Sequence, residues 1–394
     1  MASRDGFRVP QTSYARWIRR ELGRVRSAKG RIITLFDSSV PEPVDLLRAT
    51  ITAGFSTPIT SRYTSAFVDG NPYVIETLAA RYQVPREHVL CTTGATGALS
   101  LIYRALMKRG DRVLVERPGF DLFHGIARTY GYAVDYFERR GPAYRIDPEE
   151  VAARIRPETR LVVISNLHNP SGMAVDEAVL EALAAIAELN DIYVVVDEVY
   201  GDYADAAVRP RAAAQISPRL ISVNSLTKIY GLSTLRCGWI VAAPTPLAPI
   251  RALSEEVEFG VSNLAHAVAA LVLEHSREFT DYSNAIIGRC RPIIEACWKD
   301  WLDDGLIEGE LPDFGCVCFP KLAGIGDTEA FSTWLADRSG VIVAPGEFFG
   351  APGHIRVGFA QLPGQLEEGL ERLTEGLKAD GRGRSPPAQG VILN

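Results

Sequence analysis

Three apolar runs in the middle of the chain are each followed by a polar side chain that could take part in catalysis. Asn169 comes shortly after the run LVVIS, Asp197 directly follows IYVVV, and Lys228 comes shortly after LISV. A lysine becomes a usable base or nucleophile when burial or a neighbouring positive charge lowers its pKa, and a carboxylate can hold a cationic group opposite it. The pattern therefore predicts a site whose chemistry centres on the amine of Lys228.

These side chains can meet only if the runs before them are neighbouring strands of one sheet. The runs are continuous rather than alternating, which is typical of strands buried on both faces of a parallel sheet. The expected strands are Arg112–Glu116, Leu161–Ser165, Ile192–Val196, Leu220–Val223 and Gly238–Val241, with helical patterns such as Asp176–Leu189 between them. Ligands of such α/β sheets bind outside the carboxyl ends of the strands. We therefore expect the site at that edge.

The chain of 394 residues is long enough for about two domains. A long amphipathic segment from Glu278, two short strands near Gly315–Phe319 and Val341–Ala344, and a helix over Pro363–Lys378 predict a smaller α+β domain. We expect residues 1–50 to form an N-terminal arm and part of this small domain, and residues 285–380 to form the rest of it. Residues 51–284 are expected to form the large domain, a mostly parallel sheet flanked by helices. Residues 381–394 are rich in Gly, Pro and Ser and are predicted to be disordered.

The composition is that of an ordinary globular protein and argues against several classes. The net charge of −6 is not that of a dedicated nucleic-acid binder, and the basic stretch Arg16–Arg31 is expected to be a solvated helix face or an arm on a partner subunit. No apolar segment reaches the length of a membrane span, and the first residues do not resemble a signal peptide. The six cysteines lack metal-ligand spacing, which predicts a reduced, cytoplasmic protein without a metal site.

The segment around Lys228, SLTKIYGLSTLRCG, resembles the SxxK…R…G segment of class I/II aminotransferases of fold type I, the aspartate aminotransferase-like superfamily. Members of this family depend on pyridoxal 5'-phosphate (PLP). In them the lysine forms an internal Schiff base with the cofactor, while the serine and the arginine bind its phosphate. The resemblance implies these roles for Lys228, Ser225 and Arg236, and it extends from about Tyr63 to Arg356.

Two further motifs match the family after neighbouring strands. Asn169 begins the tetrapeptide NPSG, which is similar to the family's NP[ST]G turn, whose Asn hydrogen-bonds the phenolic oxygen of the cofactor. Asp197 and Tyr200 begin and end DEVY, which resembles the D-[ED]-x-Y element. There the Asp lies against the pyridine nitrogen and keeps it protonated, and the Tyr shares the phenolic oxygen.

Two earlier segments match the family at the phosphate and at the face of the ring. TGATGAL resembles a Gly-rich helix start that receives the phosphate on free N–H groups, and the residues implied are Gly94, Ala95 and Thr96. The tripeptide PGF places Phe120 where the family stacks an aromatic ring on the pyridine, although Phe120 alone would also fit a core position. The family uses cis peptide bonds at the positions of Arg117–Pro118 and Asn169–Pro170, and we expect both here.

Three residues are assigned to the substrate or to the partner subunit by the same resemblance. Arg356 matches the arginine that grips the substrate α-carboxylate with a planar, two-pronged contact. Ser39 stands where the family has the Gly of a Gly-x-Pro, and we expect it beside the substrate. Tyr63 is expected to contact the cofactor phosphate across a homodimer interface, although its spacing to Gly70 is stretched. The active sites would then be shared between two subunits.

The resemblance implies a transaminase that moves an amino group from an amino acid to a 2-oxo acid. A lyase on the same fold, cleaving a C–S bond or carrying out a related elimination, would use the same residues and stays open as the alternative. We do not expect a transcription regulator with an aminotransferase-like half, because the first strand is expected near Ile32 and leaves no room for a DNA-binding domain. Aspartate-specific relatives add a positive side chain for the distal carboxylate, which neither Glu258–Asn263 nor Thr96 supplies. We therefore expect a neutral, apolar or aromatic amino donor.

Overall fold

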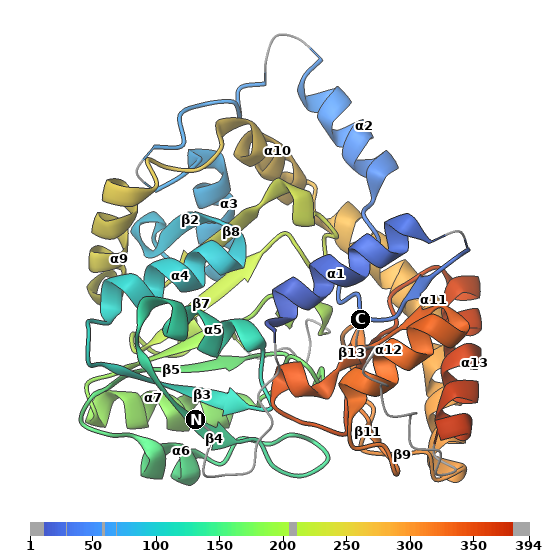
Figure 1. Cartoon of the computed structure of the whole chain (residues 1–394). Helices are drawn as coiled ribbons and strands as arrows, with labels where there is room; N and C mark the ends of the chain where they lie inside the picture. The colour runs from blue at the N-terminus through green and yellow to red at the C-terminus, as the bar shows by residue number, and fades with distance from the viewer. Residues whose placement is uncertain (1–11, 29, 57–59, 68, 205–210, 381–394) are drawn as a thin grey trace, which may run out of the picture.

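The structure, a computed structural model, describes residues 12–28, 30–56, 60–67, 69–204 and 211–380. A large unit surrounds a seven-stranded sheet, and a smaller unit is formed by the C-terminal elements together with the strand β1 near the N-terminus (Figure 1). The helix α1 (Tyr14–Ser27) lies between the two units. The site described below lies where these three parts meet.

The large sheet has the strand order β2-β8-β7-β6-β5-β3-β4. Its strands are β2 (Val89–Thr93), β3 (Arg112–Arg117), β4 (Ala133–Glu138), β5 (Thr159–Ser165), β6 (Tyr193–Asp197), β7 (Leu220–Ser225) and β8 (Cys237–Val241). The strands from β7 to β4 in this order are parallel, whereas β8 is antiparallel to both of its neighbours. The predicted α/β fold with a mostly parallel sheet is confirmed.

The five expected strands are present, and the differences from the expectation have simple causes. The run Gly238–Val241 was grouped with the parallel strands, but only the loop 226–236 with the short helix η3 (Ser233–Leu235) precedes β8. A parallel return needs a crossover of about a dozen residues or more, usually a helix, so this strand runs antiparallel. The strands β2 and β4 were not predicted. β2 ends in two threonines, and β4 is a half-buried edge strand whose residues do not form a continuous apolar run.

Helices cover both faces of the sheet, so alternate side chains of each strand are buried on opposite sides. The helices α4 (Gly94–Leu106), α5 (Asp121–Tyr130) and α9 (Pro244–Val257) cover the face to which Val113 and Val163 point. The other face, with Leu114 and Val162, is covered by α3 (Pro72–Tyr82), α6 (Pro148–Arg154), α7 (Glu177–Leu189), α8 (Ala213–Ile216) and α10 (Asn263–Glu274). The carboxyl edge of the parallel strands is therefore the place left for a ligand.

The smaller unit contains three helices, α11 (Ser276–Asp303), α12 (Thr328–Ser339) and α13 (Pro363–Asp380), and several short strands. The strand pairs are β1 (Ile33–Thr34) with β12 (Val341–Ile342), β14 (Ile355–Gly358) with both β10 (Val317–Cys318) and β13 (Ala344–Pro345), and β9 (Ile307–Glu308) with β11 (Lys321–Leu322). The long helix α11 packs its first turns, at Phe279, in the core of the large unit and its later turns, from Ile286, in the core of the small one. This packing supports our proposal of a domain boundary near residue 284.

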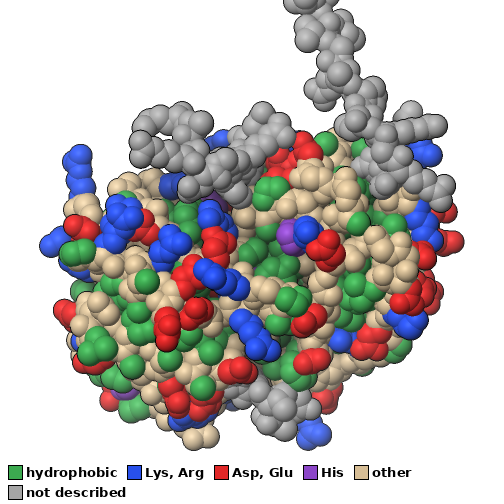
Figure 2. Space-filling view, turned by 90° about the horizontal axis from the view of Figure 1, so that it is seen from below, with side chains coloured by type: hydrophobic (Ala, Val, Ile, Leu, Met, Phe, Trp, Pro, Cys, Tyr) green, Lys and Arg blue, Asp and Glu red, His purple; other side chains and the backbone are tan. Residues whose placement is uncertain are grey.

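The basic stretch Arg16–Arg31 forms most of α1, which begins after the N-cap Ser13. Tyr14, Trp17 and Glu21 on one side of the helix are buried, while most of its arginines are exposed. Arg24 forms ion pairs with Glu21 and with Asp337 of α12. Within the described residues the stretch forms an exposed helix face, and the packing of this face on a partner subunit stays a prediction. Acidic and basic side chains are also interspersed over the face of the molecule shown in Figure 2.

The sequence analysis expected no membrane span, no metal site and reduced cysteines. No helix within the described part of the chain is both long enough and apolar enough to pass through a membrane. The same residues contain no group of three or more side chains able to hold a metal ion together. Each of the six cysteines is free. The predicted disordered tail, residues 381–394, lies outside the described residues.

One of the two expected cis peptide bonds is present. Arg117–Pro118 is cis, whereas Asn169–Pro170 is trans, so the expectation for the second bond was wrong. The cis bond of that turn lies three residues earlier, at Asn166–Leu167, directly after β5.

Candidate functional site

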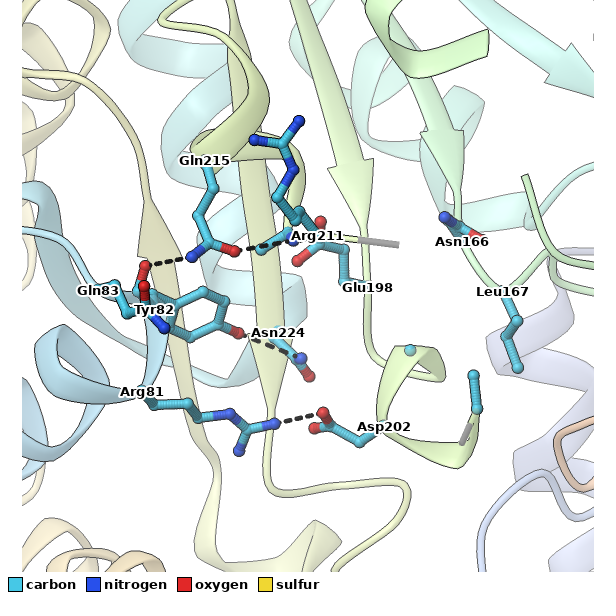
Figure 3. A pocket seen from close by; sticks show the side chains of 13 residues that line it. Arg81, Tyr82, Gln83, Asn166, Leu167, Glu198, Asp202, Arg211, Gln215 and Asn224 are labelled. Atoms are coloured by element: carbon cyan, nitrogen blue, oxygen red, sulfur yellow. Dashed lines mark hydrogen bonds and ion pairs between the residues drawn. The ribbon is translucent and has the colours of Figure 1, made fainter. Parts of the chain in front are cut away.

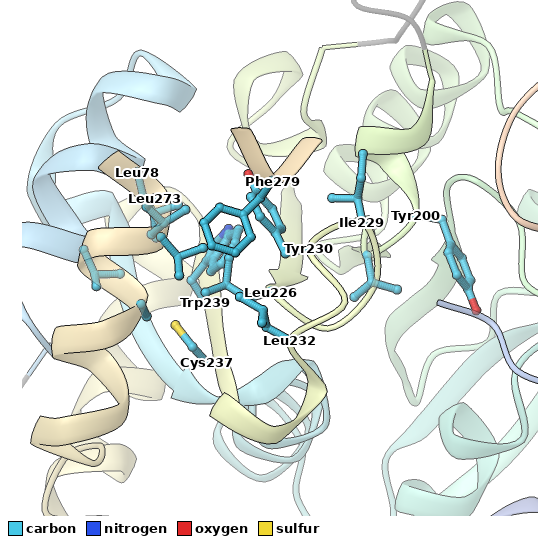
Figure 4. Close-up of a cluster of buried hydrophobic side chains, with 14 of the residues drawn as sticks. Leu78, Tyr200, Leu226, Ile229, Tyr230, Leu232, Cys237, Trp239, Leu273 and Phe279 are labelled. Carbon is cyan, nitrogen blue, oxygen red and sulfur yellow. The ribbon is translucent and has the colours of Figure 1, made fainter. Parts of the chain in front are cut away.

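Lys228 lies on the loop that joins β7 to β8, at the carboxyl edge of the sheet. On this loop Leu226, Ile229 and Leu232 are buried in the apolar cluster drawn in Figure 4. The Leu232 N–H donates to the Leu226 carbonyl at 3.0 Å and closes the loop. Because the apolar neighbours of Lys228 are anchored in the core, its side chain is directed away from them. Tyr200, labelled in Figure 4, lies at the border of the same cluster, and its hydroxyl points away from the cluster.

The Lys228 amine lies in a polar and aromatic recess. It donates to Ser38 Oγ at 2.9 Å and lies 5.2 Å from the centre of the Tyr200 ring. Burial, assisted by the positive charge of Arg356, lowers the pKa of the Lys228 ammonium. A lowered pKa increases the fraction of free amine at neutral pH, which a lysine needs in order to attack a carbonyl carbon or to accept a proton.

Asp197 ends β6, the strand beside β7, and its side chain is buried. Burial raises the pKa of the Asp197 carboxyl to about 7. The Val199 N–H, which donates to Oδ1 at 3.2 Å, and the charge of Lys228 oppose this shift but do not cancel it. A cationic ligand group beside Asp197 would favour the ionised carboxylate, so this position suits a protonated ring nitrogen.

Asn169 is positioned by a buried hydrogen-bond network. Its backbone N–H donates to Ser165 Oγ at 2.9 Å, and the Ser165 hydroxyl donates to Glu116 at 2.6 Å. Glu116 forms a buried ion pair with Arg139, whose Nε lies 2.7 Å from Oε2. Removing one partner of such a pair would leave the other charge buried without compensation. The network therefore fixes the turn that carries Asn169.

The start of α4 and the side chain of Arg236 border one small space. Gly94 begins α4 with a φ of 73°, and a Cβ added there would lie 2.6 Å from Nη2 of Arg236. A Cβ added to Gly238 would lie 2.4 Å from the carbonyl carbon of Gly94, so both positions require glycine. The first N–H groups of a helix, here at Gly94, Ala95 and Thr96, have no partner within the helix. Together with the guanidinium they suit a phosphate.

Arg356 enters the site from β14 of the smaller unit and is almost completely buried. Its Nη1 donates to Asn169 Oδ1 at 2.9 Å, and its Nη2 donates to the Phe36 carbonyl at 2.9 Å and to the Tyr14 hydroxyl. The Nε–H is buried without a partner among the described residues. A buried guanidinium donor left unpaired is costly, so this group is suited to a ligand that brings an acceptor, such as a carboxylate.

Three further predicted site residues are Phe120, Ser225 and Tyr63. Phe120 is half-buried beside the site, with its ring centre 6.2 Å from that of Tyr14. Ser225 is buried at the end of β7, and its Oγ accepts from the Thr227 N–H at 3.3 Å. Tyr63 is 45% exposed on a surface loop of the large unit. The role expected for Tyr63 would need a second subunit.

The serine that contacts Lys228 is Ser38, whereas the sequence analysis placed Ser39 at the substrate. The chain before it is held by β14, because the Gly358 N–H donates to the Leu35 carbonyl at 2.6 Å and Arg356 binds the Phe36 carbonyl. With these two carbonyls fixed, the next side chain to reach Lys228 is that of residue 38. A Gly-x-Pro pattern counted back from Pro41 gives Ser39, and its expected place beside the substrate stays a prediction.

Sequence reasoning also missed Tyr14 and Glu116. Tyr14 contacts Arg356 through both its hydroxyl and its ring, whose centre lies 5.3 Å from the guanidinium carbon. Its place at the start of α1 carried no motif, and only the structure brings α1 to the site. Glu116 did carry a signal, because a carboxylate inside an otherwise apolar run needs a buried partner.

The described residues fit the cofactor that the resemblance implies. The Tyr200 hydroxyl is buried without a hydrogen-bond partner among them. Burial raises the pKa of Tyr200, and the nearby Arg356 and Ser38 act against this rise. An incoming phenolic oxygen would satisfy this hydroxyl. The glycine-lined space at α4 suits a phosphate, and Asp197 suits a pyridinium nitrogen. Each polar part of PLP therefore has a matching group.

A separate cavity of about 380 Å³ lies on the other side of the strand ends (Figure 3). Its polar side chains bond to one another: Arg81 pairs with Asp202, and Gln215 donates to the Tyr82 carbonyl at 2.5 Å. Among the described residues that line it, none belongs to the predicted site. The chemistry is therefore assigned to the edge that holds Lys228.

Known proteins resemble this chain over most of its length. The model of the family aminotransferase class I and II matches residues 58–373. An arginine–pyruvate transaminase of Pseudomonas aeruginosa is 30% identical over 296 residues, 74% of this chain and 75% of that protein. A capreomycidine synthase of Streptomyces vinaceus is 29% identical over 310 residues, 78% of this chain and 79% of that protein. A solved PLP-dependent aminotransferase from Streptococcus suis has a TM-score of 0.83 at 26% identity, covering 94% of this chain and 98% of that one.

The raised pKa of Asp197 predicts how the stability of the cofactor-free protein depends on pH. Between the pKa of an unfolded Asp, about 4, and about 7, the folded chain binds the proton more tightly than the unfolded chain. Stability from this group is therefore present at low pH and is lost as the pH rises through this window. Asp197→Asn should remove the loss, so the melting temperature of the wild type should fall more than that of the variant between about pH 5 and about pH 8.

The matched control is Asp45→Asn, because Asp45 on α2 (Val44–Gly54) has a side chain that is 90% exposed. This variant should follow the wild type at every pH. Parallel curves for the wild type and Asp197→Asn would show that the Asp197 carboxyl is not held in its neutral form by burial.

Proposed function

Because the chain belongs to the aminotransferase class I and II family, we propose that it binds PLP on Lys228 and transfers the amino group of an L-amino acid to a 2-oxo acid. One observation carries this proposal. The Lys228 amine, with its lowered pKa, lies in the same recess as buried Asp197 and as Arg356, and these groups come from two neighbouring strands and from the smaller unit. A lysine with these neighbours has the groups that amino-group transfer needs.

When bound, PLP supplies an aldehyde and a protonated pyridine ring that accepts electrons from the substrate. The N–H groups of Gly94, Ala95 and Thr96, with Ser225 and Arg236, would bind the phosphate. Asp197 would hold the ring nitrogen in its protonated form, because an ionised carboxylate favours the cation beside it. Asn169 and Tyr200 would hydrogen-bond the phenolic oxygen, and Phe120 would cover one face of the ring.

Lys228 would move the proton of the reaction. The lowered pKa of its ammonium favours the free amine, which can take a proton from the substrate α-carbon. Ser38, 2.9 Å from Nζ, would orient the amine. Lys228 would return this proton to a neighbouring atom before water releases the oxo acid of the donor, and it would do the same in reverse when the second oxo acid takes up the amino group.

Arg356 would bind the α-carboxylate of the amino donor and of the oxo acid. Asn169 and the Phe36 carbonyl already orient the guanidinium, so little freedom is lost when a ligand binds. The Nε–H, buried without a partner among the residues that the structure describes, supports this role, as does the planar geometry that a guanidinium shares with a carboxylate.

We further propose that the amino donor has no second carboxylate. Aspartate-specific relatives have a positively charged side chain at one of two positions. In this chain those positions are the segment Glu258–Asn263 and Thr96, and neither carries a positive charge. A distal carboxylate buried without a partner would bind poorly. The arginine–pyruvate transaminase of Pseudomonas aeruginosa supports the same limit, because arginine has a single carboxylate. The neutral or aromatic donor that the sequence predicts also has no second carboxylate.

The proposed catalytic unit is a homodimer. Two adjoining segments of the large unit carry exposed apolar side chains: one loop, and a second loop together with the first turn of α10. The Ala66 N–H on the first loop donates to Asn263 Oδ1 at the start of α10 at 3.0 Å. The exposed side chains are Tyr63, Phe67, Phe259 and Leu264, at 45%, 63%, 75% and 57% exposure. Large apolar side chains gathered on one surface are typical of a protein interface. A second copy seated there would bring Tyr63 to an interface, as its expected role requires.

Product analysis separates a transaminase from a lyase and ranks the donors. We expect L-leucine, L-methionine and L-phenylalanine with pyruvate to give alanine and the matching 2-oxo acids in equal amounts, through Lys228 and Arg356. Methionine should release neither ammonia nor methanethiol. L-Aspartate should have the lowest kcat/KM, about tenfold or more below the best donor, because its second carboxylate has no partner.

Lys228→Ala is the control for uncatalysed transfer and should form no alanine. Ammonia and methanethiol without alanine would favour the lyase. Aspartate as the best donor by tenfold would contradict the proposed limit on the donor.

The dimer is tested by sedimentation of the PLP-loaded protein. The wild type should sediment as a dimer, and Phe259→Glu should shift it towards a monomer and lower turnover, because a charge buried at an apolar contact is costly. Leu189→Glu is the matched control, since Leu189 is 85% exposed at the end of α7, and it should stay dimeric. A wild type that is active as a monomer would refute the shared site.

A further inference from the structure

Asp37 lies between two residues that touch the reacting groups of the site. The Phe36 carbonyl accepts from Arg356 at 2.9 Å, and the Ser38 hydroxyl accepts from Lys228 at 2.9 Å. Consecutive Cα atoms are about 3.8 Å apart, so the backbone of Asp37 lies next to both contacts. A donor with its α-carboxylate on Arg356 and its α-carbon near Lys228 would therefore lie next to this segment.

The Asp37 carboxylate is open to a ligand. Thr34 donates to its Oδ2 at 2.6 Å, and among the described residues Asp37 forms no ion pair. The side chain is exposed, yet the surrounding protein raises the pKa of its carboxyl, as expected for a group on the wall of a recess. The charges of Lys228 and Arg356 act against this rise, so both lie near enough to Asp37 to affect it.

Aromatic side chains border the same part of the recess. Tyr14 lies near enough for the charge of Asp37 to raise its pKa, although burial has the larger effect. Ring centres of Phe120 and Phe349 lie 6.2 Å and 5.5 Å from that of Tyr14. Aromatic rings accept neutral and cationic groups alike, because the face of a ring attracts a cation. A carboxylate among them favours the cation, since an ionised carboxylate next to an apolar ligand would lose water without gaining a partner.

We propose that Asp37 selects amino donors with a positively charged side chain, a guanidinium or an ammonium group at the end of an aliphatic chain. The proposal rests on the transaminase function above and narrows its donor class. It differs from the sequence-based expectation of a purely apolar or aromatic side chain, because Asp37 directly precedes Ser38, which contacts Lys228.

The test compares donors of similar length that differ in charge, using the PLP-loaded enzyme and pyruvate. L-Arginine and L-lysine are each measured against L-norleucine, and the quantity of interest is the ratio of their kcat/KM values. The wild type should favour at least one cationic donor by about tenfold or more. Asp37→Asn should lower that ratio by about tenfold to about a hundredfold, the range of a hydrogen bond between charged groups.

Two further variants separate recognition from a structural effect. Asp37→Glu keeps the charge and should keep a ratio well above that of the Asn variant. Asp45→Asn, a matched change on the exposed surface of α2, should leave the ratio at the wild-type value. A loss of kcat/KM that is equal for norleucine and arginine in Asp37→Asn would leave the ratio unchanged and would overturn the proposal.

A binding measurement tests the same contact without turnover. 5-Guanidinopentanoate carries a carboxylate and a guanidinium but no amino group, and hexanoate is its neutral analogue. Calorimetry should give a lower Kd for the guanidino acid in the wild type, and this difference should shrink at least tenfold in Asp37→Asn. Equal Kd values in the wild type would overturn the role of Asp37, even if transamination occurs. Absence of transamination with every donor would instead refute the proposed function.

Discussion

Burial of charged and titratable groups in one recess is the constraint on which the arrangement of the site depends. Lys228, Asp197 and Arg356 lie together at the carboxyl edge of the sheet, where Lys228 is half-buried and the other two are buried. Burial opposes ionisation, so the pKa of the lysine falls and that of the aspartate rises to about 7. The guanidinium stays charged and is held by oxygen atoms of its own chain. A site in this state is matched to a ligand that brings both an anion and a cation.

Burying these charged groups costs free energy, and contacts elsewhere in the fold hold them in the site despite this cost. The loop of Lys228 is anchored by apolar side chains in the core, and the turn of Asn169 is held by the buried pair of Glu116 and Arg139. The smaller unit contributes Arg356 from β14. The N-terminal segment is tied by backbone hydrogen bonds to β12 and β14 and brings Ser38 into contact with the lysine. The site therefore forms only when segments far apart in the sequence meet.

Much of this arrangement could be predicted from the sequence, because its signals are local. Continuous apolar runs identified the parallel strands, and the polar residues after them, Asn169, Asp197 and Lys228, marked the edge. The direction of β8 depended on the length of a connection rather than on composition. Tyr14 and Asp37 could not be found in this way, since Tyr14 is identified by its contact with Arg356 of β14, and Asp37 by the contacts that its neighbours Phe36 and Ser38 make with Arg356 and Lys228. Counting within a motif singled out Ser39, whereas the contact of Ser38 with Lys228 appears only in the folded chain.

The central claim is that Lys228 carries the cofactor. Reduction of the PLP-loaded protein with borohydride fixes the cofactor on the amine that holds it, and digestion followed by mass spectrometry identifies that residue. Lys228 is expected to carry the label on the peptide that spans β7 and the following loop, and Lys228→Ala should give no labelled peptide. A label on any other lysine in the wild type would contradict the account.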